Sequence, residues 1–238
     1  MKLGRRYAPD HRDLNHLATT ILPPITSRTY RYWATTAWKR LDQGHTDSCV
    51  GHGWAHFMVT APLTPGYDAL NSHVPTTWPI RTGGINVFAA HVYDKAQTID
   101  EFDDTPPAGG TSVRAGAKTL QSISLISDYR WLFDTGSITR ALLELGPVVV
   151  GTDWLNSRFT PTPISAGNGS IIRANYATGV AGGHCYLLTG VNTNTGRYRI
   201  LNSWGTGWGN GGYAYIPISD FDTLLQRGGE ACLTSDLV

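Results

Sequence analysis

Residues 184–204 read HCYLLTGVNTNTGRYRILNSW, which is the pattern of a β-hairpin. Two apolar runs are joined by a turn rich in Asn, Thr and Gly at residues 192–196, and such a turn pairs two strands in antiparallel fashion. His184 stands at the start of the first strand and Asn202 at the end of the second. We therefore expect these two side chains to meet at one end of a sheet.

Strands dominate the second half of the chain and helices the first. Residues 210–218 favour a further strand, and residues 138–154 favour a short helix, a Gly-Pro break and a buried strand. The first half favours helices, which are expected over residues 49–60, 86–102 and, with Thr111 or Ser112 as N-cap, within 109–123. Residues 61–86 are loop-like. This division predicts an α+β fold of two unlike lobes.

We expect the boundaries of these lobes to follow the same division. The helical lobe is expected at about residues 41–130 and the antiparallel β lobe at about residues 131–238 of a single domain. A site built from both halves would lie in the cleft between them, where binding pockets commonly form.

The first forty residues differ from the rest in charge. Residues 1–40 hold eight Lys or Arg against two Asp, whereas the remainder holds eleven basic against sixteen acidic residues. Prolines interrupt this segment, which predicts an irregular basic arm that lies on the acidic body as a strap. Its expected apolar anchors are Leu14, Leu17, Ile21 and Leu22. Arginines and aromatics do not alternate in it, so we expect no nucleic-acid partner.

The composition is that of an ordinary globular protein. The 238 residues are 41% hydrophobic and 16% charged, with a net charge of +1. The start lacks the apolar core of a secretory signal, and no run has membrane-spanning length. Three scattered cysteines, Cys49, Cys185 and Cys232, do not make a disulfide framework. We expect a cytoplasmic, monomeric protein without a membrane partner.

Residues 43–56, QGHTDSCVGHGWAH, combine zinc-ligand residue types with a thiol. The residues of ligand type are His45, Cys49, His52 and His56. No second Cys or His cluster completes a structural zinc site, and the chain has no CxxC. We therefore expect no metal and no other cofactor.

A nucleophilic role for Cys49 makes sharper demands, and the chain meets them. A thiol attacks as thiolate, which a helix N-terminus and a nearby imidazole favour. Cys49 follows Ser48, the expected N-cap of a helix, and His184 offers the imidazole. Asn202 can orient that ring without neutralising its charge. Gln43, six residues before Cys49, can donate to an oxyanion together with the Cys49 backbone N–H.

With these residues the chain resembles the papain-like cysteine peptidases of the C1 family, and its bacterial and bacteriophage members more than the lysosomal ones. Four signals over about residues 35–230 carry the resemblance: the Gln43–Cys49 spacing, LLELGPVVVGTDW at 142–154, GGHCYLL at 182–188, and ILNSWGTGWGNGGYAYI at 200–216. The resemblance implies the papain-like two-lobed fold and a catalytic set of Cys49, His184, Asn202 and Gln43. It also implies that Trp204 covers the His184–Asn202 bond.

The chain departs from the family pattern around the nucleophile. Thr46 replaces the second Cys of the family signature, which removes the family's disulfide, and Val50 replaces the Trp after the nucleophile. If Trp54 took that place instead, Gly53 would stand at the nucleophile position and the chain would be inactive. The Gln43–Cys49 spacing favours the active alignment. No inhibitory propeptide is recognisable before Gln43.

The resemblance also implies substrate contacts. Gly109 and Gly110 match a stretch that offers backbone groups to the substrate, although a simple loop before a helix explains them as well. Gly183 and Cys185, beside the expected base, would border the pocket for the residue before the scissile pair. Glycines at 182 and 183 predict room there and not a charge-selective wall.

We expect a thiol endopeptidase that acts on protein or peptide substrates through a Cys49 thiolate–His184 imidazolium pair and an acyl-enzyme. Two rivals stay open. The same chemistry would serve a phage cell-wall amidase or isopeptidase. A catalytically silent binding or virion protein could use the groove and the basic arm to hold a partner.

Overall fold

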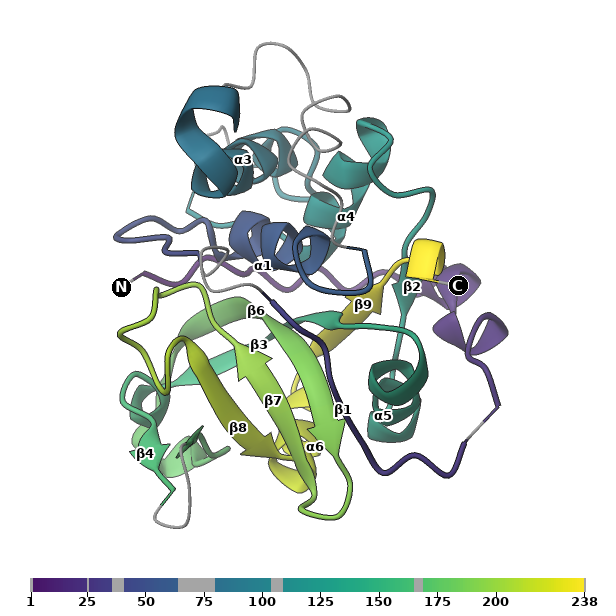
Figure 1. Ribbon diagram of the computed structural model, residues 1–238. Helices are drawn as coiled ribbons and strands as arrows, with labels where there is room; N and C mark the ends of the chain where they lie inside the picture. The colour runs from purple at the N-terminus through teal and green to yellow at the C-terminus, as the bar shows by residue number, and fades with distance from the viewer. Residues whose placement is uncertain are drawn as a thin grey trace.

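The computed structural model describes residues 2–24, 26–35, 41–63, 80–103, 109–164 and 169–237. Helices α1 (Cys49–Met58), α3 (Ile80–Gln97) and α4 (Val113–Ser122) gather above a large sheet (Figure 1). Helices α5 (Thr135–Glu144) and α6 (Ile218–Leu225) pack against the sheet. The predicted α+β fold of two unlike lobes is confirmed. No helix in the described ranges has the length and apolarity that crossing a membrane requires.

Nine strands of the described chain form one sheet, in the order β2-β9-β3-β6-β7-β8-β5-β4, with β1 also paired to β6. Their bounds are β1 Tyr30–Tyr32, β2 Arg130–Trp131, β3 Val148–Leu155, β4 Thr162–Pro163, β5 Ser170–Ile171, β6 Val180–Asn192, β7 Arg197–Leu201, β8 Tyr213–Pro217 and β9 Glu230–Leu233. All pairs are antiparallel except β5 with β8.

The predicted hairpin forms the middle of the sheet. Strands β6 and β7 pair with Leu187 opposite Leu201, so Asn202 follows directly after the register ends. The Gly-Pro prediction is also confirmed, because α5 ends at Glu144 and β3 begins at Val148. Asp134 caps α5 by accepting a hydrogen bond from the Ser137 backbone N–H at 2.8 Å.

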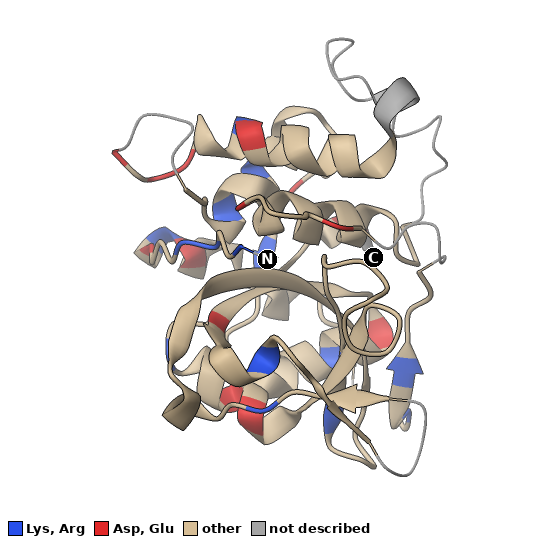
Figure 2. Cartoon of the chain, turned by 90° about the vertical axis from the view of Figure 1, so that its left-hand side faces the viewer, with Lys and Arg blue, Asp and Glu red and all other residues tan. Residues whose placement is uncertain are grey.

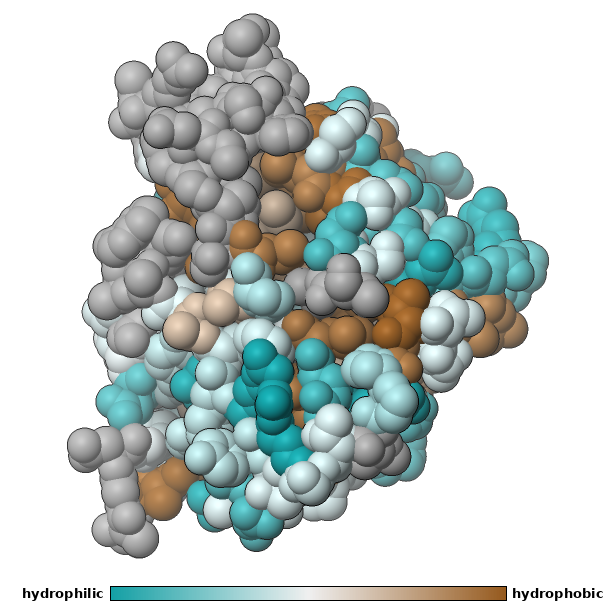
Figure 3. Space-filling model, turned by 45° about the vertical axis from the view of Figure 1, so that its right-hand side comes forward, coloured by the Kyte–Doolittle hydropathy of each residue, from teal (hydrophilic) through white to brown (hydrophobic). Residues whose placement is uncertain are grey.

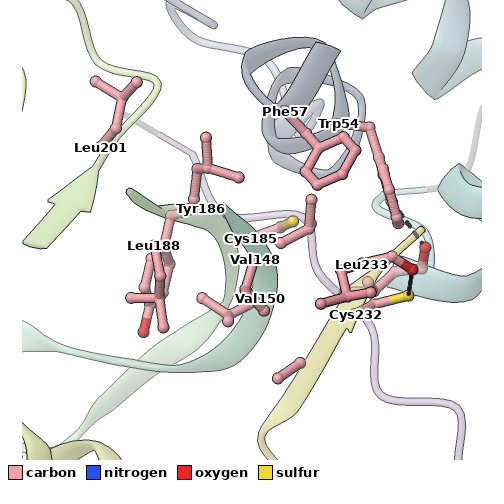
Figure 4. Packing of buried hydrophobic residues seen from close by; sticks show 14 of the residues in the cluster. Trp54, Phe57, Val148, Val150, Cys185, Tyr186, Leu188, Leu201, Cys232 and Leu233 are labelled. Atoms are coloured by element: carbon pink, nitrogen blue, oxygen red, sulfur yellow. Dashed lines mark hydrogen bonds between the residues drawn. The ribbon is translucent and has the colours of Figure 1, made fainter. Parts of the chain in front are cut away.

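Helix α1 is the centre of the hydrophobic core. All ten of its residues are buried, and Figure 4 shows Phe57 above Cys185 of β6 and Trp54 pointing towards Leu233 of β9. The indole N–H of Trp54 donates to the Val113 carbonyl at 3.0 Å, so burying this ring leaves no donor unpaired. Full burial of such a side chain contributes about 2–3 kcal/mol.

Two glycines let α1 approach its neighbours closely. A Cβ on Gly51 would lie 2.1 Å from the Ala89 carbonyl oxygen of α3, and a Cβ on Gly53 would lie 2.6 Å from the Cys185 sulfur of β6. The helical cost of glycine, about 1 kcal/mol each, is therefore offset by packing on both sides. This contact holds Cys49, the first residue of the helix, at the seam between the lobes.

The two other helices of this lobe differ in how well their starts were predicted. Helix α3 begins at Ile80, six residues before the predicted start, with non-helical backbone at Gly84 (φ 71°). The rest of the predicted loop at 61–86, residues 64–79, lies outside the described residues. Helix α4 begins at Val113 with the predicted cap, because the Ser112 side chain accepts from the Ala115 N–H at 3.0 Å.

The N-terminal arm runs through the seam between the lobes. Figure 1 shows this segment in purple below α1, and Figure 2 shows the N-terminus between the helices and the sheet. Further along, Tyr30–Tyr32 pairs with β6 as strand β1. Of the predicted anchors, Leu22 is buried, and Leu17 and Ile21 are half-buried. The prediction for Leu14 is wrong: it is 61% exposed, because the turn at His11–His16 points it outward.

One face of the molecule leaves apolar side chains uncovered. Figure 3 shows apolar residues at mid-height of the face it presents, near the level where the helices meet the sheet. Tyr7, Leu14 and Phe133 are exposed and border a cavity of about 510 Å³ beside the arm.

Candidate active site

Cys49 is held at the N-terminus of α1, as predicted. Ser48 precedes the helix but does not cap it with its side chain. Its hydroxyl lies 2.6 Å from that of Thr46 and 3.1 Å from Nδ1 of His52. The Cys49 side chain is fully buried, and its sulfur is in contact with backbone groups of Gly4 and Cys185. The nucleophile candidate therefore lies against β6 and the arm.

His184 and Asn202 meet across the hairpin. The Nε2 atom of His184 lies 2.7 Å from Oδ1 of Asn202, and both side chains are fully buried. The other ring nitrogen, Nδ1, has no hydrogen-bond partner among the described residues. Cys185, whose backbone contacts the Cys49 sulfur, follows His184 directly. The imidazole therefore has one nitrogen oriented by Asn202 and one without a partner among the described residues, and it directly precedes the residue that contacts the Cys49 sulfur.

Two tryptophans enclose the imidazole. Trp204 stacks on His184 with ring centroids 4.7 Å apart at 29°, as the resemblance implied, and is 5% exposed. Trp154 of β3 meets the ring edge-on, also at 4.7 Å. Trp154 lies in the GPVVVGTDW stretch, but no sequence signal marked it as a neighbour of the base. The two indoles keep water from the His184–Asn202 bond.

The Gln43 amide points into the cleft and holds a peptide carbonyl. Its Nε2 donates to the Lys2 carbonyl at 3.1 Å and to the Thr46 carbonyl at 2.7 Å. Its Oε1 accepts from the Ser203 hydroxyl at 2.7 Å, which fixes the orientation of the amide. Ser203 follows Asn202 and was not predicted as a site residue.

The arm occupies the cleft as an extended peptide. The Arg5 N–H donates to the Gly183 carbonyl at 3.0 Å, the Thr111 N–H donates to the Gly4 carbonyl at 2.8 Å, and the Arg6 N–H donates to the Thr111 carbonyl at 2.9 Å. The sequence predicted a strap on the body, and the structure places its first residues over the sulfur of Cys49.

A second set of contacts anchors the arm to α4. Arg114 is buried and donates from Nη2 to the Ala8 carbonyl at 2.9 Å and from Nε to Asp13 at 3.0 Å. Its Nη1 donates to Glu101 at 3.1 Å. These carboxylates raise the pKa of Arg114 against the lowering effect of burial, so the guanidinium stays charged.

The predicted substrate glycines meet this peptide only in part. Gly183 accepts a hydrogen bond from it, and the contact of Gly183 with a substrate stays a prediction. On the other side the pairing residue is Thr111, one position beyond the predicted Gly109 and Gly110. Gly110 lets the arm pass closely, since a Cβ there would lie 2.3 Å from the Gly4 carbonyl oxygen, and Gly109 faces Asp47 at 3.4 Å.

Two expectations near the base are wrong. The Cys185 sulfur packs against Gly53 inside the core, so its side chain does not border the pocket. Gly183 does not create room either, because a Cβ there would lie 2.1 Å from the Arg5 carbonyl oxygen. Alternation along β6 explains Cys185: its neighbour His184 faces the cleft, so the next side chain faces the core.

Burial under the arm favours the neutral forms of the two candidate groups, Cys49 and His184. Burial raises the pKa of Cys49 to about 11, although backbone contacts and the charge of Arg5 act in the opposite direction. Burial lowers the pKa of His184 to about 4, against the raising effect of the Asn202 hydrogen bond. The expected lowering of the Cys49 pKa is therefore absent, because the filled cleft excludes the water that would solvate a thiolate.

The geometry also bears on the two alternatives for residues 43–56. His52 Nδ1 bonds to the Ser48 carbonyl at 2.9 Å, and His56 Nε2 accepts from the Leu41 N–H at 3.0 Å. Within the described ranges no three His, Cys, Asp or Glu side chains gather as metal ligands. Gly53 lies inside α1 against Cys185, so the helix N-terminus belongs to Cys49.

Comparison with known sequences identifies the family of the chain. The family profile "Papain family cysteine protease" matches residues 80–223, which is more than half of the chain. The chain belongs to the papain family of cysteine proteases. The match includes His184 and Asn202, whereas Cys49 and Gln43 precede it.

Two curated papain-family relatives match parts of the chain. Cathepsin O of Mus musculus is 31% identical over 119 residues, and a cysteine protease of Blomia tropicalis is 40% identical over 96 residues. These stretches cover 49% and 40% of this chain. They span 33% and 27% of the relatives, so the chain matches a third or less of either protein.

Solved structures share the papain-like fold. Xylellain, a cysteine protease from Xylella fastidiosa, aligns with a TM-score of 0.53 at 17% identity over 98% of this chain and 96% of its own. Digestive procathepsin L2 from Tenebrio molitor aligns with a TM-score of 0.54 at 14% identity, over 95% and 76% of the two chains. At such identities the likeness concerns the fold.

Proposed function

We propose that this papain-family chain is a cysteine endopeptidase that acts through Cys49 and His184. The observation that carries the proposal is the peptide seated in the cleft. The Gln43 amide binds the Lys2 carbonyl of that peptide, and the backbone of Gly4 contacts the Cys49 sulfur. A cleft that holds an extended peptide beside a thiol and an oriented imidazole has the parts that peptide-bond hydrolysis requires.

In the proposed reaction His184 takes the thiol proton and the Cys49 thiolate attacks the scissile carbonyl. The Gln43 amide and the Cys49 backbone N–H stabilise the oxyanion. His184 then protonates the leaving amine, the C–N bond breaks, and an acyl-enzyme forms. Water, deprotonated by the same imidazole, hydrolyses the thioester and restores the thiol. Asn202 holds the ring, and Trp204 shields its hydrogen bond from solvent.

Substrate can enter only after the arm leaves. The arm fills the backbone positions beside Cys49, and its burial keeps the thiol and the imidazole neutral. Water that enters the emptied cleft would solvate both charges, which lowers the pKa of Cys49 and raises that of His184. We infer that the thiolate–imidazolium pair forms in this opened state.

The Gly4→Ala variant tests this proposal. A Cβ on Gly4 would lie 1.7 Å from the Asp47 backbone carbonyl oxygen, so the arm cannot stay in place. We expect iodoacetamide to alkylate Cys49 at least tenfold faster at pH 7 in Gly4→Ala than in the wild type, measured by mass spectrometry. Adding His184→Ala should remove the gain. Gly207→Ala is the matched control, because a Cβ there meets nothing within 4 Å.

The same variants separate the rival functions. Gly4→Ala should also cleave casein, and loss of that cleavage in Gly4→Ala/Cys49→Ala would assign it to the thiol. If Cys49 stays inert in Gly4→Ala, the peptidase proposal fails and a silent binding protein is favoured. Release of amines from purified cell walls with casein untouched would favour the amidase.

We further propose that the chain acts as a monomer on protein substrates, without nucleic acid or membrane, in a reducing bacterial or phage-infected cytoplasm. The three buried cysteines are free, which suits such a compartment. Thr46 in place of the family's second Cys is a further support. Sedimentation of the purified protein and thiol counting after lysis under alkylating conditions test these points.

A further inference from the structure

The arm places one side chain in a pocket that the sequence did not reveal. Arg5 leaves the cleft backbone and reaches Glu230 of β9, with Nε 2.8 Å and Nη2 2.6 Å from Oε2. Nη2 also donates to the Gly228 carbonyl. The two charged side chains are only 3% and 7% exposed. An arginine of the peptide in the cleft is therefore wholly enclosed.

The walls of this pocket are built to admit a long side chain. Gly151 of β3 stands opposite Glu230 in the sheet register. A Cβ on Gly151 would lie 2.7 Å from Val113 and 2.8 Å from Nε of Arg5. The channel that carries the arginine stem from the cleft to the carboxylate therefore exists only because position 151 has no side chain.

The carboxylate at the end of the channel needs a cation. The side-chain hydrogen bonds that Glu230 makes among the described residues both come from Arg5. A buried carboxylate without a partner costs several kcal/mol, and burial alone already raises the pKa of Glu230. When the arm leaves, this carboxylate stays at the end of the pocket without Arg5, its ion-pair partner among the described residues.

We propose that the pocket ending at Glu230 recognises an arginine side chain of the substrate, in the place that Arg5 occupies in the arm. Recognition of arginine rests on the proposed peptidase function. A guanidinium fits better than an ammonium, because two donors reach the carboxylate while one also reaches the Gly228 carbonyl. Glu230 thus sets specificity, contrary to the sequence expectation of a pocket without charge selection.

The Arg5–Glu230 ion pair could instead serve only to hold the arm in place, without recognising any ligand. The Arg5→Ala variant distinguishes this structural role from ligand recognition. In the full-length variant the pocket is emptied while Glu230 remains. We expect N-acetyl-arginine amide to bind Arg5→Ala at least tenfold more tightly than N-acetyl-lysine amide or N-acetyl-leucine amide, measured by titration calorimetry. The wild type, whose pocket is filled, should bind none of them tightly.

The double variant Arg5→Ala/Glu230→Gln is the matched control. It keeps the shape of the pocket and removes the charge, so we expect the arginine preference to fall to within about twofold of leucine. Equal binding of the three amides by Arg5→Ala, or an arginine preference that survives Glu230→Gln, would overturn the proposal. If Arg5→Ala folds only with added ligand, circular dichroism should show that the arginine amide restores the fold and the leucine amide does not. Failure of both would count against the pocket.

Binding of the amides requires no functional thiol, so the two proposals fail separately. An inert Cys49 in Gly4→Ala with intact arginine binding would remove the peptidase function and leave the pocket. A reactive Cys49 without arginine binding would do the reverse. Where both hold, Gly4→Ala should cleave a peptide library with arginine enriched at one position, and Gly4→Ala/Glu230→Gln should lose that enrichment.

Discussion

At the scale of residues, the site depends on which face of a strand or helix each side chain takes. His184 faces the cleft and Cys185 the core, and the strand alternation that separates them also separates the proposed base from a thiol packed in the core. Sequence spacing predicted the meeting of His184 and Asn202, because a hairpin turn fixes the register of its strands. Glu230 escaped prediction because its contact with Arg5 joins residues 225 positions apart, with no local pattern to signal it.

Removal of the Cys49 sulfur should abolish catalysis and leave the protein folded. We expect Cys49→Ala to lose all detectable turnover, measured on the Gly4→Ala background, because no other thiol faces the cleft. Loss of one small buried atom should cost about 1 kcal/mol of unfolding free energy, measured by urea denaturation. Cys232→Ala, at a buried position outside the cleft, is the control and should keep the turnover. Residual turnover in Cys49→Ala would contradict the assignment of the nucleophile.

At the scale of elements, helix α1 connects sequence pattern and site most directly. Its start at Cys49 was predicted from Ser48, and Gly51 and Gly53 are the positions where it packs closely on its neighbours. The elements that pack against it, α3 and β6, could not be predicted. A glycine permits a close approach, but it does not indicate which element approaches. The start of α4 was predicted from its Ser112 cap. The start of α3 was missed, because the residues before position 86 are rich in Pro, Gly, Ser and Asn, which local propensity assigns to a loop.

The packing of α1 against α3 gives a prediction at this scale. Gly51→Ala would place a Cβ 2.1 Å from the Ala89 carbonyl oxygen, and backbone cannot yield cheaply. We expect a loss of about 1–3 kcal/mol in the free energy of unfolding despite the higher helix propensity of alanine. Urea denaturation beside the Gly207→Ala control provides the measurement. An unchanged or increased stability would show that the helices can move apart.

At the scale of the whole molecule, the filled cleft makes the fold sensitive to acid. Burial lowers the pKa of both His52 and His184 to about 4. In the unfolded chain these rings bind a proton below about pH 6.5, so the unfolded state holds more protons between pH 6.5 and 4. The free energy of unfolding therefore falls as the pH decreases through this window.

The contribution of His52 to this loss of unfolding free energy can be measured separately. Each histidine should remove up to about 3 kcal/mol between pH 6.5 and pH 4, since one pKa unit corresponds to about 1.4 kcal/mol. Urea denaturation of the wild type and of His52→Gln at several pH values should show a shallower decline in the variant. His11→Gln is the control, because the side chain of His11 is 93% exposed. Equal slopes in all three proteins would contradict the linkage.

The arm that occupies the cleft is covalently part of the chain. This tether determines how strongly the arm competes with substrate for the cleft. A tethered segment acts at an effective concentration of about a millimolar, which a free substrate at micromolar levels cannot match. A single cut between the arm and Gln43 would dilute the segment about a thousandfold in a micromolar solution. One cleavage would then open the cleft irreversibly, and the opening would not depend on the substrate concentration before the cut.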